Sequence, residues 1–188
     1  MPIWSSFSDF LRFYIPRSRN LAFFGIGASI FVNIFYASGK LRQLIALLQR
    51  VVESSVRIDG VTVASIGPGI LALIGVRPAD TPADAERLLD RLLRYRIFAD
   101  AADRMNLSLA EVGGGLLLVP QFTLAADTRR GLRPGFSTAA PPALGRALFA
   151  HLVTTAQGRH APVGCGVFGA DMQVSLTNDG PVTFWLES

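Results

Sequence analysis

Hydrophobic residues recur along this chain with two different periods, and the pattern predicts a sheet covered by helices. Short apolar runs with the length of strands are bounded by turn signals, the clearest of which is Asp59-Gly60. We predict strands at residues 44–51, 55–58, 61–66, 70–76, 116–122, 163–168, 172–176 and 182–186. Residues 100–114 lack this pattern and are predicted to form a loop-rich connection.

Two segments instead carry apolar residues at helical spacing. The first follows Thr81, a good N-cap residue, and Pro82, which suits the first helical position, and it reaches about Arg96. The second opens at Pro142. Their apolar stripes are Leu88, Leu89, Leu92 and Leu93 in the first helix, and Leu144, Leu148, Phe149, Leu152 and Val153 in the second. We therefore predict a single α/β domain of mixed β-sheet with two main helices, spanning residues 41–188.

The first 40 residues form a hydrophobic extension that differs from this domain. Residues 20–39 contain no charged side chain, and the flanking Arg17, Arg19 and Lys40 complete a pattern that approaches a membrane span. Residues 37–39 also imitate a signal-peptide cleavage site. Three interpretations are open: sequence upstream of the true translation start, which we favour, a membrane anchor or presequence, or a folded addition. We expect this extension not to be part of the fold.

The charge of the chain is unevenly distributed. The formal net charge is +4, but the first forty residues hold four cations and one anion, which leaves only +1 for the domain. Half of the 188 residues are hydrophobic, so a disordered protein is excluded. A broad basic face for long nucleic acids is not expected either. The densest positive cluster is Arg129, Arg130 and Arg133, either a solvated loop or a local contact for phosphates.

Cysteine and histidine are too scarce for several kinds of chemistry. Cys165 is the single cysteine, so the chain cannot form an internal disulfide, and a reducing compartment is the simplest setting. His151 falls on the second predicted helix and His160 follows it, where surface or helix-end roles are expected. We expect no metal and no cofactor, and we interpret Cys165 as a small packing residue rather than a nucleophile.

Two short motifs combine small and conformationally special residues. Residues 120–124 read Pro-Gln-Phe-Thr-Leu at the end of a predicted buried strand, and residues 178–183 read Asn-Asp-Gly-Pro-Val-Thr. The bond between Gly180 and Pro181 has a weaker trans preference than other peptide bonds, and glycine tolerates unusual dihedral angles. Such motifs indicate that main-chain polar groups, rather than charged side chains, recognise a ligand.

Together with other segments, these motifs resemble the D-aminoacyl-tRNA deacylase family in order and spacing. The other segments are residues 44–51, 66–70, 95–98, 105–108, 139–142 and 168–172, so the resemblance runs from about Leu44 to Glu187. It implies a cytoplasmic, homodimeric hydrolase that acts on the 3′ end of aminoacyl-tRNA. Such an enzyme releases D-amino acids from mischarged tRNA and also clears glycyl-tRNA. One departure is Pro120, where the family usually has serine.

The resemblance also implies roles for individual residues. A cis Gly180-Pro181 dipeptide would enter the partner subunit's site, where its carbonyls hold the α-amino group. A D-residue would then point into open space, and an L-residue would collide with the wall. Arg50 matches an arginine that braces this dipeptide, although a surface residue ending a strand is the plain alternative. Phe168 and Met172 would line the pocket of the terminal adenosine, unless they are ordinary core residues.

The catalytic step has two possible forms. Thr123 has the hydroxyl of a nucleophile, but the sequence identifies no base beside it. The resemblance implies a second form, which we favour: backbone amides around Gln121 and Phe122 support the oxyanion, the ribose hydroxyl of the tRNA assists the attack, and Thr123 positions the substrate.

Two alternative functions stay open. If the missing serine supplied only shape, activity survives Pro120. If its hydroxyl or amide oriented the substrate, the protein becomes a deacylase of broader specificity for misacylated tRNA. The other alternative is a catalytically inactive protein that binds nucleic-acid ends. A membrane association depends on whether residues 1–40 are translated.

Overall fold

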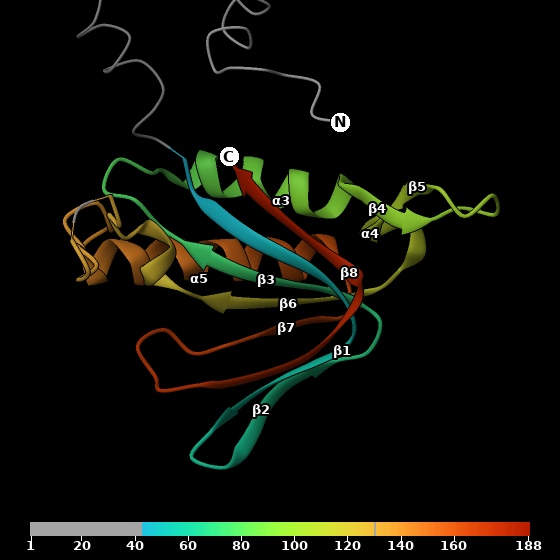
Figure 1. Cartoon of the computed structure of the whole chain (residues 1–188), viewed down its shortest axis with the longest axis horizontal. Coiled ribbons are helices and arrows are strands. Elements are labelled where there is room, and N and C mark those ends of the chain that lie inside the picture. The colour runs from blue at the N-terminus through green and yellow to red at the C-terminus, as the bar shows by residue number, and fades with distance from the viewer. Residues whose placement is uncertain (1–42, 130) are drawn as a thin grey trace, which may run out of the picture. The chain divides into compact units, whose positions relative to one another are not determined.

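A computed structural model describes residues 43–129 and 131–188, so the extension predicted at 1–40 and Arg130 lie outside the described residues. The strands of the main sheet follow the order β2-β1-β3-β6-β7, and β8 pairs with the free side of β1 (Figure 1). Their bounds are β1 Ile45–Ile58, β2 Val61–Ile66, β3 Gly69–Gly75, β6 Gly115–Pro120, β7 Val163–Cys165 and β8 Gln173–Glu187. The sheet is mixed, because β3, β6 and β7 are parallel and the remaining pairs are antiparallel.

Strand β1 is continuous where the sequence predicted two strands. Its first half pairs with β3 and its second half with β2, while β8 follows almost its whole length on the other side. Polar Ser54 interrupts the apolar pattern but is accommodated within the strand. It is buried, and its hydroxyl donates a hydrogen bond to the Ser175 carbonyl at 2.8 Å. The predicted strands at 172–176 and 182–186 likewise belong to one strand, β8.

Three further predictions were wrong in their boundaries. The strand predicted to reach residue 122 ends at Pro120 and is followed by the short 3₁₀ helix η1, Phe122–Ala125. Strand β7 ends at Cys165 rather than residue 168. The connection predicted to be a loop at 100–114 contains β5 and α4, and β5 pairs with β4. The bounds of these three elements are β4 Arg96–Ala99, β5 Met105–Ser108 and α4 Leu109–Val112.

The missed helix α4 is short but is capped at both ends. The Ser108 side chain and the Glu111 carboxylate form a capping box, in which the Ser108 amide donates to Glu111 at 2.7 Å. Gly113 ends the helix in the left-handed conformation, with φ 63°. Capping groups rather than apolar periodicity stabilise a helix this short, and periodicity alone therefore overlooked it.

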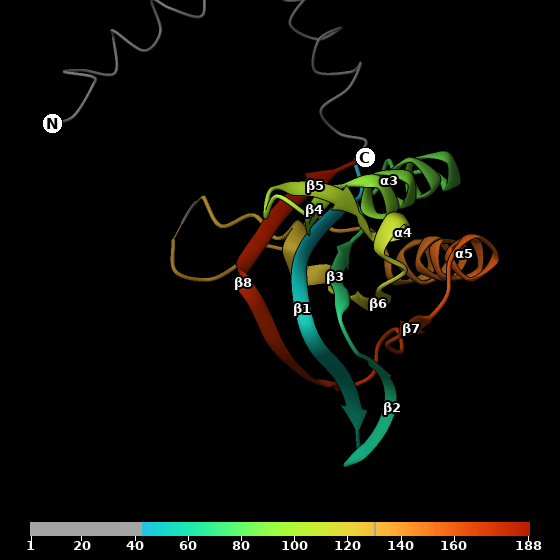
Figure 2. The same cartoon turned by 90° about the vertical axis from the view of Figure 1, so that its right-hand side faces the viewer.

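The two predicted helices, α3 Pro82–Arg94 and α5 Pro142–Arg159, are confirmed and lie on one side of the sheet (Figure 2). Their predicted stripes are buried, except that Leu144 is partly exposed. They pack on residues of β1, β3 and β6 to form the main core, which includes Leu48, Ile70 and Leu116. A smaller core lies on the opposite face of the sheet around Val51, Leu71, Leu117 and Val119.

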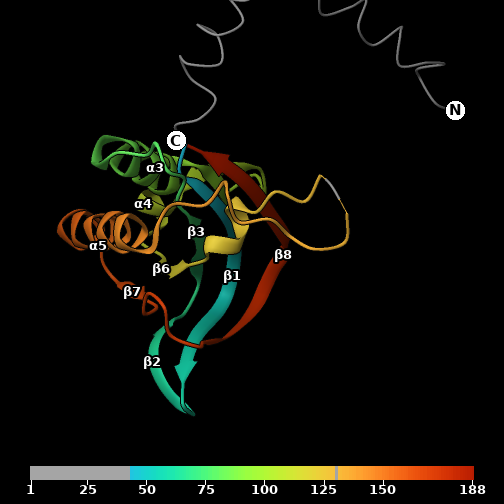
Figure 3. The same cartoon turned by 90° about the vertical axis from the view of Figure 1, so that its left-hand side faces the viewer.

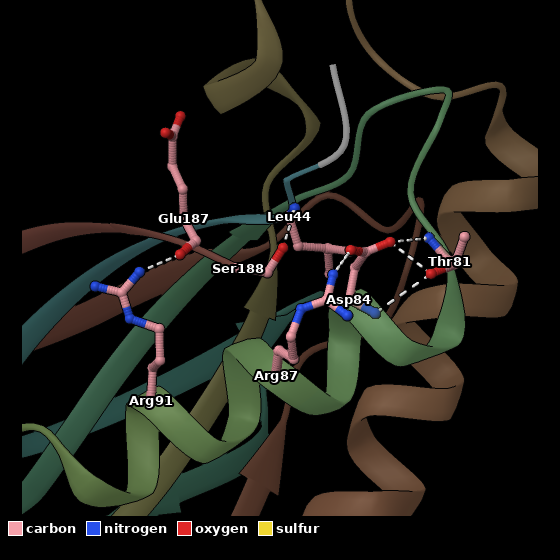
Figure 4. A network of polar contacts seen from close by, with 7 residues as sticks. All are labelled: Leu44, Thr81, Asp84, Arg87, Arg91, Glu187 and Ser188. Carbon is pink, nitrogen blue, oxygen red and sulfur yellow. Dashed lines mark hydrogen bonds and ion pairs between the residues drawn. The ribbon is translucent and has the colours of Figure 1, made fainter. Parts of the chain in front are cut away.

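The two ends of the domain are fastened beside the first helix (Figure 4). The Leu44 amide donates to the Ser188 hydroxyl at 3.1 Å, and Arg91 of α3 donates to the Glu187 carbonyl. Thr81 and Asp84 form the capping box that begins α3, with the Thr81 amide 2.8 Å from Asp84 Oδ2. The edge strand β8 is thereby held against both β1 and α3.

One buried carboxylate near this point is incompletely satisfied. Asp80 is 5% exposed, and its Oδ2 accepts a hydrogen bond from the Arg77 amide at 2.6 Å. Its Oδ1 has no hydrogen-bond partner among the described residues. Burial raises the pKa of Asp80 from 3.8 to about 6, the Arg77 amide opposes that rise, and the nearby Asp84 charge adds to it.

We predict that Asp80→Asn stabilises the protein above pH 6. The folded state holds the Asp80 proton more tightly than an unfolded chain does, so stability falls as pH rises from about 4 through 6. Asparagine keeps an acceptor for the Arg77 amide and carries no charge, so the variant gains about 2–3 kcal/mol at pH 8 and almost nothing at pH 4. Urea unfolding at both pH values measures this difference. The exposed Asp103→Asn is the control, and an equal gain for Asp80→Asn at both pH values would contradict the assignment.

Candidate active site

The first motif occupies the turn between β6 and η1, which we call the Gln121 turn. The Gln121 amide continues the ladder of the sheet by donating to the Ile74 carbonyl at 2.7 Å. The Gln121 side-chain amide then donates to the Thr123 hydroxyl, and the Gln121 carbonyl accepts from the Leu124 amide at 3.2 Å. Phe122 and Thr123 are exposed. The turn therefore presents two residues to solvent from a backbone that the sheet holds in place.

These hydrogen bonds bear on the main-chain donors that the turn can offer to a ligand. The Gln121 amide, predicted to be among the supporting donors, is already bonded within the sheet. Phe122 and Thr123 instead begin a 3₁₀ helix, and the first amides of a helix have no acceptor within it. The amides of Phe122 and Thr123 are therefore the main-chain donors that this turn offers, and the Gln121 side chain orients Thr123.

Pro120 fits the end of β6 without loss of a sheet hydrogen bond. Even-numbered residues of β6 direct their amides toward β7, as shown by the bond from the Leu116 amide to the Pro162 carbonyl at 3.0 Å. Strand β7 ends at Cys165, the partner of Leu118, so the nitrogen of Pro120 lies beyond the last pair. A missing N–H is tolerated at such a position.

Met172 approaches the end of β6, whereas Phe168 packs against the main core beside α5. A β-carbon added at Gly166 would lie 2.8 Å from Met172 Sδ and 3.2 Å from Pro120 Cδ, so only glycine allows these groups to converge. Both Phe168 and Met172 are partly buried and pack against the cores, which agrees with the plain alternative for them. Sequence reasoning missed Arg146, whose guanidinium lies 5.2 Å from the centre of the Phe168 ring.

The second motif is an excursion in the pairing of β8 with β1. Asn178 pairs with Val51 and Thr183 pairs with Gln49, so residues 179–182 lie opposite Arg50 alone. This four-residue segment, which we call the excursion, contains exposed Gly180 and Pro181. The peptide bond between them is cis, as the resemblance implied. Backbone groups that would have joined the ladder are instead turned out of it.

Arg50 and Asn178 hold the excursion from its two ends. Arg50 Nε donates to the Asp179 carbonyl at 3.2 Å and pairs with the Asp179 carboxylate at 2.9 Å, and Nη1 donates to the Ile97 carbonyl at 2.5 Å. The Asn178 side chain accepts from the Val182 amide at 2.7 Å and donates to the Val182 carbonyl at 3.3 Å. Arg50 is in the middle of β1 with a side chain only 15% exposed, so it is not a surface residue ending a strand.

Within one chain the two motifs lie far apart. Arg50 pairs with Ile70, which pairs with Leu116, whereas Pro120 is four residues further along β6. Four residues correspond to about 13 Å along the strands, and the three strand spacings from β8 to β6 add about 14 Å across them. The excursion is therefore about 20 Å from the Gln121 turn. Figure 1 shows β6 pointing toward one end of the sheet while the middle of β8 lies at the other.

The predicted basic cluster lies on a loop that follows η1. Asp127 and Gly135 close this loop with backbone bonds of 2.7 and 2.9 Å, and we call residues 127–135 the basic loop. It extends from the side of the sheet opposite α3 and α5 (Figure 3). Two hydrogen bonds from Arg129 to the Asp127 carboxylate hold the pKa of that aspartate well below its usual range. A cavity of about 510 Å³ lies at the foot of this loop, lined by Arg77, residues 124–129 and Thr138 among others.

The remaining candidates lie away from the Gln121 turn. His151 contacts Glu86, His160 contacts the Gly114 carbonyl, and Cys165 is partly buried in β7. Across the described residues, no group of three or more histidine, cysteine or acidic side chains is placed to hold a metal ion. No helix in residues 43–129 or 131–188 is long and apolar enough to cross a membrane.

The described residues thus form a mixed sheet with helices on one face, an exposed turn after β6 and a proline-containing excursion in β8. The model of the family described as D-Tyr-tRNA(Tyr) deacylase matches residues 47–187, so this chain belongs to that family. A protein of Thioalkalivibrio sulfidiphilus named D-aminoacyl-tRNA deacylase is 69% identical over 144 residues, which are 77% of this chain and 97% of that protein.

Two solved structures share the fold. One, named c-Myc DNA unwinding element binding protein, is 33% identical with a TM-score of 0.73, and the match covers 77% of this chain and 98% of that one. The other, described as a probable eukaryotic D-amino acid tRNA deacylase, has a TM-score of 0.66 at 20% identity, and the match covers 78% and 100% of the two chains. The second likeness concerns the fold alone.

We predict that Arg50→Ala loosens the excursion and lowers both stability and activity. The substitution removes a mostly buried cation and leaves the Asp179 and Ile97 carbonyls without their donor, which costs about 1–3 kcal/mol. Thermal unfolding and kcat/KM with a D-aminoacyl-tRNA measure the two effects. Arg57→Ala, on the exposed part of the same strand, is the matched control and should change stability by less than about 0.5 kcal/mol. Equal effects of the two variants would refute a bracing role for Arg50.

Proposed function

We propose that this protein hydrolyses the ester bond of D-aminoacyl-tRNA and releases the free D-amino acid and tRNA. The observation that carries the proposal is the family match across residues 47–187, which includes both the Gln121 turn and the excursion. The match to this domain covers almost the whole length of two relatives named D-aminoacyl-tRNA deacylase. Because aminoacyl-tRNA is the substrate, the site of action is the cytoplasm.

The reaction is the attack of water on the ester carbonyl carbon. A tetrahedral intermediate forms, its bond to the ribose oxygen breaks, and that oxygen takes up a proton as the tRNA leaves. Phe122 and Thr123 are exposed at the start of η1, and their amides supply the donors that stabilise the developing oxyanion. In the described residues Thr123 Oγ1 contacts Gln121 and no histidine or carboxylate, which favours a positioning role over a nucleophilic one. The neighbouring ribose hydroxyl then assists the attack.

The second part of the proposal is a homodimer that completes the site. Within one chain the excursion is too far from the turn to touch the same small ester, at about 20 Å. A second copy removes this difficulty if its excursion enters the first copy's site. The sheet face opposite the main helices offers an interface, because Trp185, Leu47 and Leu73 are cross-strand neighbours and none of them is fully buried. Trp185 is 49% exposed.

We predict that Trp185→Glu converts the dimer into a monomer. A charge in the centre of an apolar interface is costly to bury, so association should weaken at least about a hundredfold. Sedimentation at micromolar concentration measures the oligomeric state, and deacylation of D-tyrosyl-tRNA should be lost in parallel. Val61→Glu, which replaces an apolar residue that is 66% exposed on β2, is the matched control. A fully active monomeric Trp185→Glu would overturn the shared site.

The excursion gives the site its chirality in this proposal. The Asp179 carbonyl already accepts a hydrogen bond from Arg50, whereas Gly180 and Pro181 are exposed and their carbonyls are left for the substrate. There they accept hydrogen bonds from the α-ammonium group of the substrate. Held in this way, a D-residue directs its side chain outward, and an L-residue is excluded by collision, so one site serves many D-amino acids.

We predict different defects for Gly180→Ala and Thr123→Ala. Gly180 has φ +131°, and an added β-carbon would lie 2.6 Å from Val182 Cγ2, so the substitution deforms the excursion. The preference for D-tyrosyl-tRNA over L-tyrosyl-tRNA should fall at least about tenfold. Thr123→Ala should slow turnover by less than about a hundredfold and keep that preference, because removal of a true nucleophile costs far more. Gly67→Ala, which has open space around it, is the glycine control.

Pro120 favours a second candidate, a deacylase of broader specificity. Its ring stands beside Gly166 and Met172, where the family usually places a serine. Turnover of glycyl-tRNA and L-aminoacyl-tRNA within about tenfold of the D-substrate would support this candidate. A purely binding role is suggested only by the name of one structural relative, the c-Myc DNA unwinding element binding protein, and it predicts nucleic-acid binding without ester hydrolysis.

A further inference from the structure

An exposed aromatic pair lies between the Gln121 turn and the basic loop. Phe122 is 56% exposed and Phe136 is 44% exposed, and their ring centres are 5.1 Å apart at an interplanar angle of 51°. By contrast, Phe149 in the core is 5% exposed. Two large rings that contact each other and yet remain in water represent apolar surface that folding of this chain does not bury.

The backbone on both sides of this pair is held firmly. Phe122 begins η1 directly after the Gln121 amide joins the sheet. Phe136 follows Gly135, which closes the basic loop, and its carbonyl accepts from the Ala139 amide at 3.1 Å. Two residues further along, the Thr138 hydroxyl donates to the Ala125 carbonyl at 2.5 Å. The rings are therefore exposed on a fixed support rather than on a loose loop, as a binding surface requires.

The charge around the pair is positive. Residues 127–135 contain three arginines and one acid. The Arg129 side chain is 82% exposed and is oriented by Asp127. Arg133 makes no hydrogen bond or ion pair with any residue in 43–129 or 131–188. Exposed aromatic rings next to arginines are the combination with which proteins hold single-stranded nucleic acid, by stacking bases and neutralising phosphates.

We propose that Phe122 and Phe136 form a stacking platform for an unpaired base of the tRNA 3′ end, with Arg133 at the adjoining phosphate. This inference rests on the proposed function. In this inference the base is one that precedes the terminal adenosine, whose pocket the family resemblance implies at Phe168 and Met172. Charge complementarity points to this occupant, because tRNA phosphates neutralise the arginines of the basic loop. The platform makes affinity depend on nucleotides that take no part in the chemistry.

The test compares two substrates of wild type, Phe136→Ala and Phe136→Trp. D-tyrosyl-tRNA contains the preceding bases and D-tyrosyl-adenosine lacks them. Loss of one stacked base should raise KM for D-tyrosyl-tRNA roughly tenfold or more in Phe136→Ala, with a much smaller change for D-tyrosyl-adenosine. Phe136→Trp should restore the lower KM. Leu132→Ala, which removes a fully exposed apolar side chain from the same loop, is the control.

Three results would overturn the platform. They are an equal rise in KM for both substrates, no rise for either, or a Phe136→Ala protein that sediments as a monomer, which would make the pair a subunit contact. Binding of an uncharged ACCA oligoribonucleotide, followed by fluorescence anisotropy, separates this inference from the proposed function. Wild type that hydrolyses neither ester refutes the deacylase, whereas the platform is refuted if Phe136→Ala binds the oligonucleotide as tightly as wild type does.

Discussion

The structure depends on one irregularity in strand pairing, the four residues of β8 that stand opposite Arg50 alone. In a regular antiparallel pair, alternate residues of this segment would direct their carbonyls into the ladder with β1. Arg50 on one side and Asn178 on the other replace the missing ladder bonds at the ends of the excursion. The cost of interrupting the sheet is thus offset locally, and Gly180 and Pro181 are presented on a rigid support.

The same sheet geometry separates the excursion from the Gln121 turn and so connects function to assembly. The strand register places the two motifs at different positions along the strands and three strand spacings apart. No side-chain movement closes a gap of about 20 Å. The half-exposed row of Trp185, Leu47 and Leu73 provides the surface through which a second copy completes the site in our proposal. Catalysis, chirality and dimerisation are then consequences of one arrangement of strands.

Substrate recognition in this scheme relies on main-chain groups and aromatic surface rather than on charged side chains. The turn offers the amides of Phe122 and Thr123, the excursion offers two carbonyls, and Phe122 and Phe136 offer ring faces. Substitutions other than proline leave main-chain groups in place, and Pro120 removes only an N–H that lies beyond the last pair of β6 with β7. Every tRNA shares the same unpaired 3′ end, and stacking on rings is suited to a shared element that needs no base-specific reading.

The sequence by itself determined the fold class, both main helices and their buried faces, because apolar periodicity and N-terminal capping signals are local properties. It also located both motifs. It did not show that β1 and β8 are continuous, since polar residues such as Ser54 interrupt an apolar pattern and are compensated only by a partner strand. Nor did it show that the Gln121 amide donates to the Ile74 carbonyl or that the Asn178 side chain accepts from the Val182 amide. The contact of the Arg146 guanidinium with the Phe168 ring was also not evident from it. These contacts join residues far apart in the chain, and only the register of the folded sheet decides which of them meet.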